Sequence, residues 1–210
     1  MPSTDASPYA VIAAVTAGYV IGSVPIALLV GRRQRVDLRE VGDRNPGYWN
    51  AKDHLSRRAS IGVFLGDSAK GVLAGAIGIA LPGPWWIAYM AVAAAMIGHA
   101  WPLFAHFRGG RSILTFAGGV CVLSPVAAAI AIAALLVVTL LRSFAWGARV
   151  GVFGYPLAQL IVDPATHVAA TGVLMSIIGV RFGQAALATR APHGDRHDDR
   201  HRDRHGDHAG

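Results

Sequence analysis

One short stretch of the chain combines histidine, arginine and glycine residues in a pattern that suits phosphate binding. Residues 98–112 read GHAWPLFAHFRGGRS and follow a long apolar run. Polar groups at the edge of an apolar segment are costly to hold there, which makes them candidates for function. Arg108 and Arg111 carry fixed positive charge beside Gly109-Gly110, a pair that lets backbone N–H groups turn toward an anion. A membrane-edge turn would give the same pattern, so spacing alone leaves both interpretations open.

A second group of charged residues lies inside an apolar segment. Asp67 and Lys70 are three residues apart, and therefore on one face of the helix expected over 61–81. A charge at the centre of a membrane helix costs about 2.5–3.5 kcal/mol on insertion scales, so the two are expected to pair or to face a water-filled cavity. A structural ion pair is favoured here over direct catalysis.

The elements that hold these groups are those of a membrane protein. The chain has 210 residues, 53% of them hydrophobic, and so much apolar surface cannot be buried in one soluble core. Its net charge of +7 fits basic loops that set membrane orientation rather than a surface for nucleic acid. The one cysteine, Cys121, excludes a disulfide framework and a cysteine metal site. No metal site and no cofactor are predicted.

The apolar runs predict an all-α polytopic membrane protein with about seven transmembrane helices. Ser124-Pro125 interrupts the long run 113–141, because a residue before proline avoids helical geometry. The positive-inside rule favours two short helices over one long helix there. The basic segment 31–60 is expected in the cytoplasm, which places the N-terminus outside and the C-terminus inside. The expected segments are 9–30, 61–81, 85–104, two within 113–141, 144–162 and 165–182.

The chain ends are expected to lie outside the membrane domain, which covers 9–190. Residues 1–8 form an external segment without the basic region of a cleaved signal peptide, so the first apolar run is expected to remain as a helix. Residues 191–210 are rich in His, Asp and Arg and are predicted to be disordered, because they have no apolar partners. Histidines recur there every four residues and would form a metal-binding face only if the tail were helical.

The stretch that begins at Gly98 resembles a signature motif of the bacterial acyl-phosphate-dependent glycerol-3-phosphate acyltransferases, the PlsY family. That motif is G-H-x-x-P-x-F-x-x-F-[KR]-G-G-K-G, and Arg111 and Ser112 stand where it has lysine and glycine. Three shorter motifs agree in order and spacing. Residues 22–25 resemble G-S-[IV]-P, residues 37–42 resemble D-[IL]-R-x-x-G, and residues 67–71 fit D-x-x-K-G.

The resemblance implies a seven-helix protein of the bacterial plasma membrane with its active site on the cytoplasmic face. It also implies transfer of a fatty acyl group from acyl phosphate to the 1-hydroxyl of sn-glycerol 3-phosphate, which gives lysophosphatidate in phospholipid synthesis. The expected partners are therefore these two substrates and the lipid bilayer. Acyl phosphate is a mixed anhydride with a good leaving group, so direct attack needs no covalent enzyme intermediate.

For this reaction the chain must hold two phosphates close together against their repulsion. We expect Arg39 and Arg111 to clamp phosphates through bidentate hydrogen bonds, with Arg108 at the edge of the loop. Asparagine side chains and glycine N–H groups would donate further hydrogen bonds. The predicted substrate-binding residues are Ser23, Arg39, Asn50, Lys70, Arg108, Gly109 and Gly110, and the predicted catalytic residues are Asn45, His99 and Arg111.

His99 has two alternative interpretations. As a general base it would take the proton of the glycerol hydroxyl, since histidine titrates near neutral pH. As a helix-end residue it would bond the backbone and fix the loop that follows. His106 matches no position of the family motif and is expected to be a surface residue.

Two further family motifs are altered or missing. Where the first motif continues G-S-G-N-x-G-A-T-N, Asp43 replaces serine and places a carboxylate near the expected phosphate, with Arg44 beside it to neutralise the charge. Pro46 and Trp49 stiffen and crowd this loop, and the third motif is not recognisable. The alternative function is therefore a catalytically degenerate paralogue that binds an anion or a lipid. A small transporter is a weaker alternative, because the sequence shows no clear internal repeat.

Overall fold

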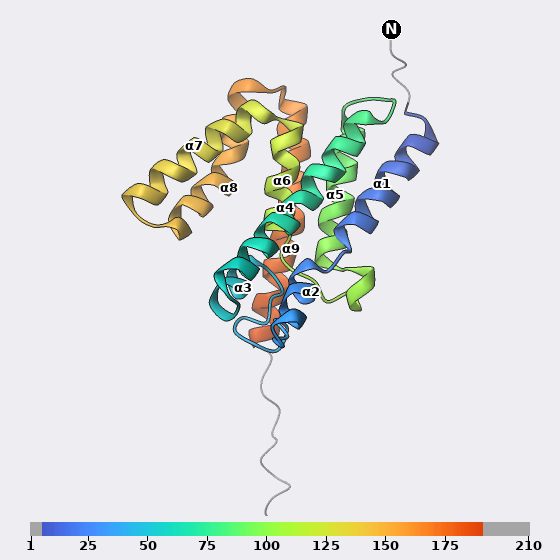
Figure 1. Cartoon of the computed structure of the whole chain (residues 1–210). Helices are drawn as coiled ribbons and strands as arrows, with labels where there is room; N and C mark the ends of the chain where they lie inside the picture. Colours follow the sequence, from blue (N-terminus) through green and yellow to red (C-terminus); the bar gives the residue numbers. More distant parts are fainter. Residues whose placement is uncertain (1–5, 191–210) are drawn as a thin grey trace, which may run out of the picture.

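The structure, a computed structural model, describes residues 6–190, and all regular structure in that part of the chain is helical (Figure 1). The first apolar run forms two helices, α1 (Pro8–Gly22) and α2 (Ile26–Arg33). The break lies at Ser23-Val24-Pro25, because proline lacks an N–H and keeps the residue before it out of the helical region. α2 therefore continues from α1 in a different direction.

The segment 31–60 contains a helix that the sequence did not predict, α3 (Tyr48–His54). Beyond it, the observed helices follow the expected apolar segments closely. They are α4 (Arg57–Ala80), α5 (Trp86–Ala100), the short 3-10 helix η1 (Leu103–Ala105), α6 (Ile113–Leu123), α7 (Pro125–Leu141), α8 (Phe144–Val162) and α9 (Ala165–Arg190).

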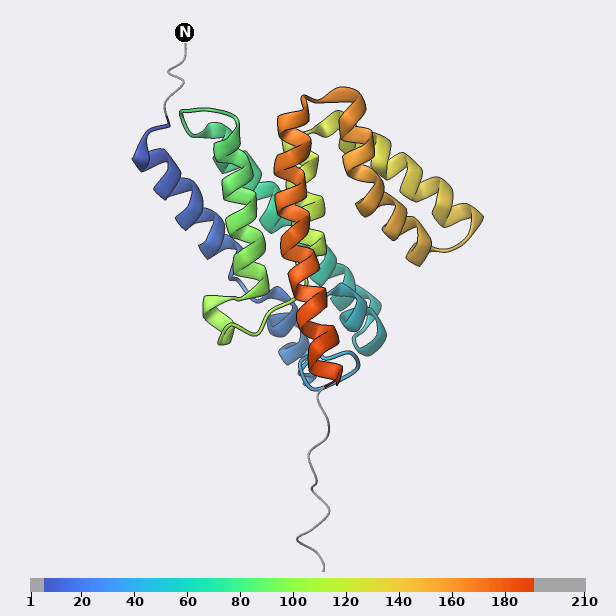
Figure 2. The same cartoon turned by 180° about the vertical axis from the view of Figure 1, so that it is seen from behind.

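The long run 113–141 is two helices, as predicted, and the division falls at Ser124. α7 turns back from the end of α6 and forms an antiparallel hairpin with α8. This hairpin leans away from the other helices in both views (Figures 1 and 2). Trp49 of α3 packs on Phe144 at the hairpin turn, with ring centroids 5.4 Å apart. The turn is thus in contact with the segment 31–60.

Small residues let α1 and α5 approach closely. A Cβ atom on Gly18 or Gly22 would overlap the carbonyl oxygen of Ala91 or Ala95, respectively. A Cβ on Gly98 would likewise overlap the Tyr19 carbonyl oxygen. Backbone contact of this kind is typical of helix packing in membranes, where small residues form the interface. It brings the break between α1 and α2 next to the end of α5, where His99 lies.

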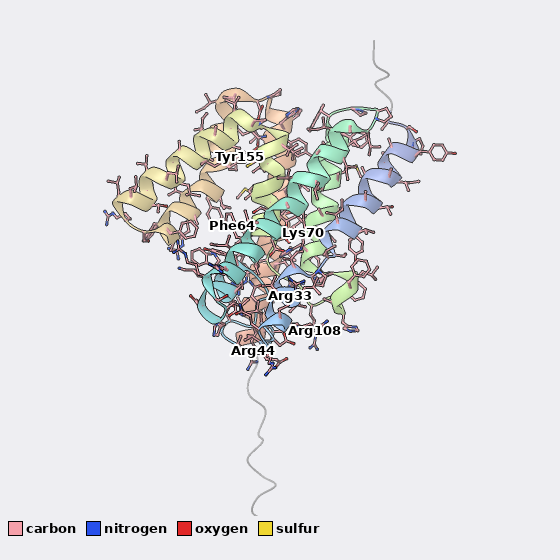
Figure 3. All side chains as sticks on the ribbon, viewed as in Figure 1. Arg33, Arg44, Phe64, Lys70, Arg108 and Tyr155 are labelled. Carbon is pink, nitrogen blue, oxygen red and sulfur yellow. The ribbon has the colours of Figure 1, made fainter. Side chains whose placement is uncertain are left out.

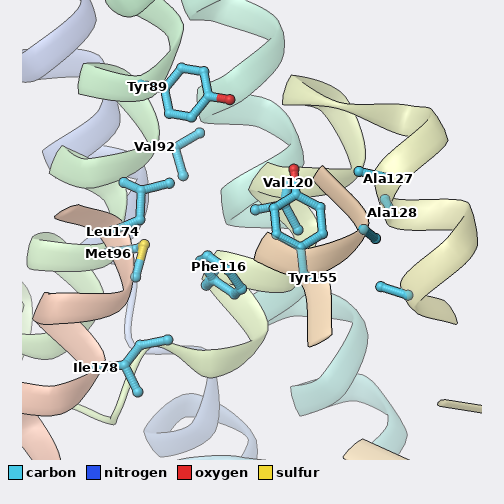
Figure 4. Packing of buried hydrophobic residues seen from close by; sticks show 12 residues of the cluster. Tyr89, Val92, Met96, Phe116, Val120, Ala127, Ala128, Tyr155, Leu174 and Ile178 are labelled. Atoms are coloured by element: carbon cyan, nitrogen blue, oxygen red, sulfur yellow. The ribbon is translucent and has the colours of Figure 1, made fainter. Parts of the chain in front are cut away.

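The main apolar core lies between α5, α6, α7, α8 and α9 (Figure 4). Phe116 and Tyr155 meet edge to face, with ring centroids 5.9 Å apart. Beside this core, the buried Gln159 side chain donates to the Tyr89 hydroxyl at 3.0 Å and accepts from Thr171 at 2.7 Å. These bonds join α5, α8 and α9. They also satisfy the buried amide, which would be costly to bury without hydrogen-bond partners.

Among residues 6–190, four helical stretches are long and apolar enough to cross a membrane by length and composition: Pro8–Arg33, Arg57–Ala80, Trp86–Ala105 and Ala165–Ala188. Basic side chains gather at one end of the bundle, where Figure 3 places Arg33, Arg44 and Arg108. Lys70 lies deeper, within the helices (Figure 3). The bundle therefore has one strongly cationic end, as the charge distribution along the sequence predicted.

Candidate active site

Three buried polar side chains meet where α4 passes the end of α5. Lys70 Nζ lies 2.9 Å from Asp67 Oδ1 and 3.3 Å from His99 Nδ1. His99 Nδ1 lies 3.5 Å from the same Asp67 oxygen. All three side chains are at least nine-tenths buried. The predicted Asp67–Lys70 ion pair is therefore confirmed, and His99 is its third member.

The proton on His99 decides what its other nitrogen can do. If Nδ1–H donates to the Asp67 carboxylate, Nε2 keeps a lone pair and can accept a proton. If Nδ1 instead accepts from the Lys70 ammonium, Nε2 carries the proton and is a donor. Nε2 is directed at the glycine loop, since a Cβ on Gly110 would overlap it. Only the first tautomer makes His99 a general base toward that loop.

The glycine pair is folded back onto the end of α5. The N–H of Gly109 donates to the Ala100 carbonyl at 3.2 Å, and the N–H of Gly110 donates to the His99 carbonyl at 3.1 Å. These two N–H groups were predicted to bind phosphate, but in this conformation backbone carbonyls already accept their hydrogen bonds. Glycine is required here for space instead, since a Cβ on Gly109 would overlap the His99 carbonyl oxygen.

Arg181 of α9 holds the same loop from the other side. Its Nε donates to the Gly110 carbonyl at 3.0 Å, and one terminal nitrogen donates to the Gly109 carbonyl at 2.8 Å. Its guanidinium also lies 5.3 Å from the ring centroid of Trp101. Arg181 was not among the residues predicted to form the site. No local signal could have found this contact, because the partners are 71 and 72 residues apart.

Arg111 is held by a carboxylate of the segment 31–60. Its guanidinium lies 3.1 Å from Asp43 Oδ2 and 4.7 Å from the ring centroid of Phe182. The sequence had predicted that Arg44 would neutralise Asp43, but the observed ion-pair partner is Arg111. The carboxylate is thus placed at an expected phosphate clamp, as the replacement of serine indicated.

Ser112 occupies the position where the family motif has glycine, and the backbone shows why. Its φ is +61°, in the left-handed region that favours glycine. Its hydroxyl donates to the Met96 carbonyl at 2.7 Å, which fixes the start of α6 against α5. A serine in this strained conformation is therefore held by a hydrogen bond that glycine would not make.

Arg39 is also paired with a carboxylate, at a second place. Its terminal nitrogen lies 2.6 Å from Asp37 Oδ2, and its Nε lies 3.0 Å from Oδ1. These hydrogen bonds hold the pKa of the Asp37 carboxyl at about 2, below its usual 3.8. The stabilisation from this pair is therefore present above pH 3.8 and is lost only as the pH falls through about 2. Arg39 does not line the cleft at His99, contrary to the shared pocket that was expected.

Asn45 and Asn50, two of the predicted site residues, make local hydrogen bonds, whereas the Ser23 hydroxyl makes none among residues 6–190. Asn50 is buried, and its amide donates to the carbonyls of Leu38 at 2.8 Å and Val41 at 3.0 Å. Asn50 was predicted to donate to substrate, but in this conformation both amide hydrogens hold the turn before α3. Asn45 is half-buried, and its backbone N–H donates to Asp43 Oδ1 at 3.1 Å. Ser23 is buried with no hydrogen-bond partner for its hydroxyl in the part of the chain described.

A cleft of about 240 Å³, counting its open mouth, brings several predicted residues together. Lys70 and His99 line its inner part, and the loop carrying Arg108 and the glycine pair lines its rim. Pro46 contributes a wall from the segment 31–60. The cleft therefore combines a buried ion pair, an imidazole and an arginine with apolar walls from the break between α1 and α2.

No group of three or more His, Cys, Asp or Glu side chains that could hold a metal ion occurs among residues 6–190. The histidine-rich stretch 191–210, where weak metal binding was considered, lies outside the described residues.

The arrangement of helices defines an integral membrane class of protein. A crystal structure of PlsY, an integral membrane glycerol 3-phosphate acyltransferase, in the glycerol 3-phosphate form has a similar fold, with a TM-score of 0.74 and 24% identity. That match covers 85% of this chain and 91% of the other. The lysophosphatidic acid form gives a TM-score of 0.71 and 23% identity, covering 85% and 92%. Because both identities are below 25%, these matches show only that this chain has the same fold.

Sequence relatives define the family within that class. The profile described as Glycerol-3-phosphate acyltransferase matches residues 12–187, and the chain belongs to this family. A glycerol-3-phosphate acyltransferase of Laribacter hongkongensis is 33% identical over 186 residues, which cover 84% of this chain and 90% of that protein. One from Rubrobacter xylanophilus is 45% identical over 115 residues, 53% of this chain. The chain spans 56% of the length of the Rubrobacter protein. Glycerol-3-phosphate acyltransferase 5 of Dehalococcoides mccartyi is 36% identical over 67% of this chain, and the chain spans 60% of its length.

Proposed function

We propose that the chain is a membrane acyltransferase that moves a fatty acyl group from acyl phosphate to sn-glycerol 3-phosphate. The observation that carries this proposal is the cleft in which His99, in contact with Asp67 and Lys70, faces the loop of Arg108 and the glycine pair. The names of the relatives, all glycerol-3-phosphate acyltransferases, support the choice of acceptor.

The proposed chemistry is a direct acyl transfer. Lys70 and Arg108 attract the phosphate of the acceptor into the cleft. His99 Nε2 takes the proton of the 1-hydroxyl as that oxygen attacks the acyl carbon, while Asp67 holds Nδ1–H and stabilises the imidazolium. The new ester bond forms and the bond between the acyl carbon and the phosphate oxygen breaks. The leaving phosphate takes the proton from His99 and departs as hydrogen phosphate, which restores the neutral imidazole. Once it separates from Asp43, Arg111 binds the same acceptor phosphate at the mouth of the cleft.

The proposed membrane placement has seven crossings, with the N-terminus outside and the cleft on the cytoplasmic face of a bacterial plasma membrane. α6, α7 and α8 add three short crossings to the four longer stretches, and the membrane domain extends over residues 9–190. The gathering of basic side chains at the end of the bundle that carries the cleft supports this orientation.

The proposal is tested by supplying membranes that contain the chain with palmitoyl phosphate and labelled glycerol 3-phosphate. Lysophosphatidate is expected from the native chain, and Arg111→Ala should lower its rate by about 10²-fold, the scale for loss of one preorganised contact to developing charge. Arg142→Ala, at the exposed turn between α7 and α8, is the matched control and should retain activity. Palmitoyl-CoA should give little product. Equal rates with both donors would contradict acyl phosphate as the donor.

The Asp43–Arg111 ion pair gives a separate prediction. Replacing Asp43 with serine removes the carboxylate that competes with phosphate for Arg111, so KM for glycerol 3-phosphate should fall about fivefold, as expected for about 1 kcal/mol of an exposed charge pair. Asp53→Ser, at an exposed position of α3, removes the same charge and should leave KM unchanged. An unchanged or raised KM in Asp43→Ser would show that this carboxylate does not oppose the substrate.

A second candidate function is a catalytically degenerate family member that binds an anion or a lipid. It is favoured by a specific observation. The two arginines expected to clamp phosphate, Arg39 and Arg111, form ion pairs with Asp37 and Asp43. The N–H groups of the glycine pair donate to backbone carbonyls. This candidate predicts saturable binding of glycerol 3-phosphate by folded protein without formation of lysophosphatidate. The acyl transfer assay therefore separates the two functions.

A further inference from the structure

A second cavity lies beside the His99 cleft and shares Pro25 and Leu28 with it as lining residues. It measures about 670 Å³, counting its open mouth. Arg32 and Arg39 line it from the segment around α2, and Phe104 and His106 line it from the loop after α5. None of the groups that form the Asp67–Lys70–His99 cluster is among its lining residues, so it is a separate site.

The charge of this cavity is positive. Arg32 lies in the last turn of α2 and is exposed, whereas the Arg39 guanidinium forms an ion pair with Asp37. Two guanidinium groups against one carboxylate leave an excess of one positive charge, and the His106 imidazole offers a further polar group. Arginine suits phosphate oxygens because its planar fork donates two parallel hydrogen bonds.

Part of the wall of the cavity is apolar and uncovered by protein. Leu29 is 45% exposed and Phe104 is 57% exposed, and both line it. Leu103 and Phe107, their neighbours in the loop, are also more than half exposed. In a membrane protein, such side chains beside arginines at the end of a helix lie at the boundary between acyl chains and headgroups. The site therefore offers cationic and apolar contacts to one ligand.

We propose that this cavity binds the phosphate of an anionic phospholipid of the surrounding leaflet. Arg32 and Arg39 contact the phosphate, and the acyl chains lie along Leu29 and Phe104. A soluble phosphate compound would leave the apolar wall without a partner. A zwitterionic lipid would place its own cation near Arg32. The proposal does not depend on acyl transfer, since it uses no contact of His99, Lys70 or Arg111.

The experiment measures lipid binding to the purified full chain in detergent, with phosphatidylglycerol and phosphatidylcholine of identical acyl chains. Phosphatidylglycerol should bind about fivefold more tightly, the factor for one basic residue at an anionic lipid surface. Arg32→Gln should remove most of this preference. The matched control is Arg33→Gln, which removes the same charge from the adjacent exposed residue of α2 that does not line the cavity. His106→Gln is a second variant and should weaken the preference less.

Three outcomes would overturn the proposal. Equal binding of both lipids would show that the cavity does not select an anionic head. An equal loss in Arg33→Gln and Arg32→Gln would assign the preference to diffuse surface charge. Displacement of phosphatidylglycerol by inorganic phosphate or glycerol 3-phosphate at similar concentrations would assign the site to soluble phosphates. Both arginines are exposed, so each variant is expected to fold, and a melting curve checks this.

Discussion

Replacing Lys70 with methionine is expected to lower the free energy of unfolding by about 3–5 kcal/mol, because it leaves the buried Asp67 carboxylate without its ion-pair partner. Asp67 is 1% exposed, so solvent cannot compensate for the lost ammonium. Reversible unfolding in mixed micelles measures this change. Lys52→Met, at an exposed position of α3, is the matched control.

The double variant Asp67→Leu/Lys70→Met separates the cost of an unpaired charge from a loss of packing. Apolar residues of similar volume in place of both members of a buried pair are commonly neutral or stabilising. The double variant should therefore recover most of the stability that Lys70→Met loses. If Lys70→Met alone were as stable as the native chain, the Asp67 carboxylate would be protonated or hydrated, and the buried ion pair would be refuted.

The second large effect is expected at His99. His99→Asn and His99→Gln should each lower kcat for acyl transfer by about 10²–10⁴-fold, the usual contribution of a positioned general base. Asparagine keeps a polar group near the position of Nδ1, and glutamine keeps one near the position of Nε2. The two variants therefore distinguish the alternatives for this residue, when kcat and KM for glycerol 3-phosphate are measured together.

If His99 only holds the Asp67–Lys70 ion pair through Nδ1, His99→Asn should retain kcat within about threefold, while His99→Gln loses the contact to Asp67 and Lys70. That result would contradict the general-base role and leave His99 as a positioning residue. If the base role is correct, both variants lose kcat and neither is rescued by the retained polar group. A melting curve for each variant shows that the buried cluster still folds.

Local features of the sequence predicted much of the fold. The helix break at Ser124 followed from the proline after it, and the Asp67–Lys70 pair followed from a spacing of three residues on one helical face. Both depend on backbone geometry within a few residues, which a single sequence reports directly. The split of the first apolar run at Pro25 has the same local cause, but one segment over 9–30 had been expected there.

Contacts between distant segments were not predictable. Arg181 reaches the carbonyls of the glycine pair, and Asp43 reaches Arg111, only because the helices pack as they do. Asn50 was assigned to substrate, but its amide satisfies backbone carbonyls that a linear sequence cannot place beside it. The residue types pointed to anion binding, whereas the folded chain had already supplied partners for several of these groups.

A binding titration of the purified chain with glycerol 3-phosphate determines whether the cationic cleft beside His99 holds this ligand. We expect saturable binding that competes with inorganic phosphate, is lost in Arg111→Ala and is retained in Arg142→Ala. Absence of binding by folded native protein, or equal affinity in Arg111→Ala and the native chain, would contradict it.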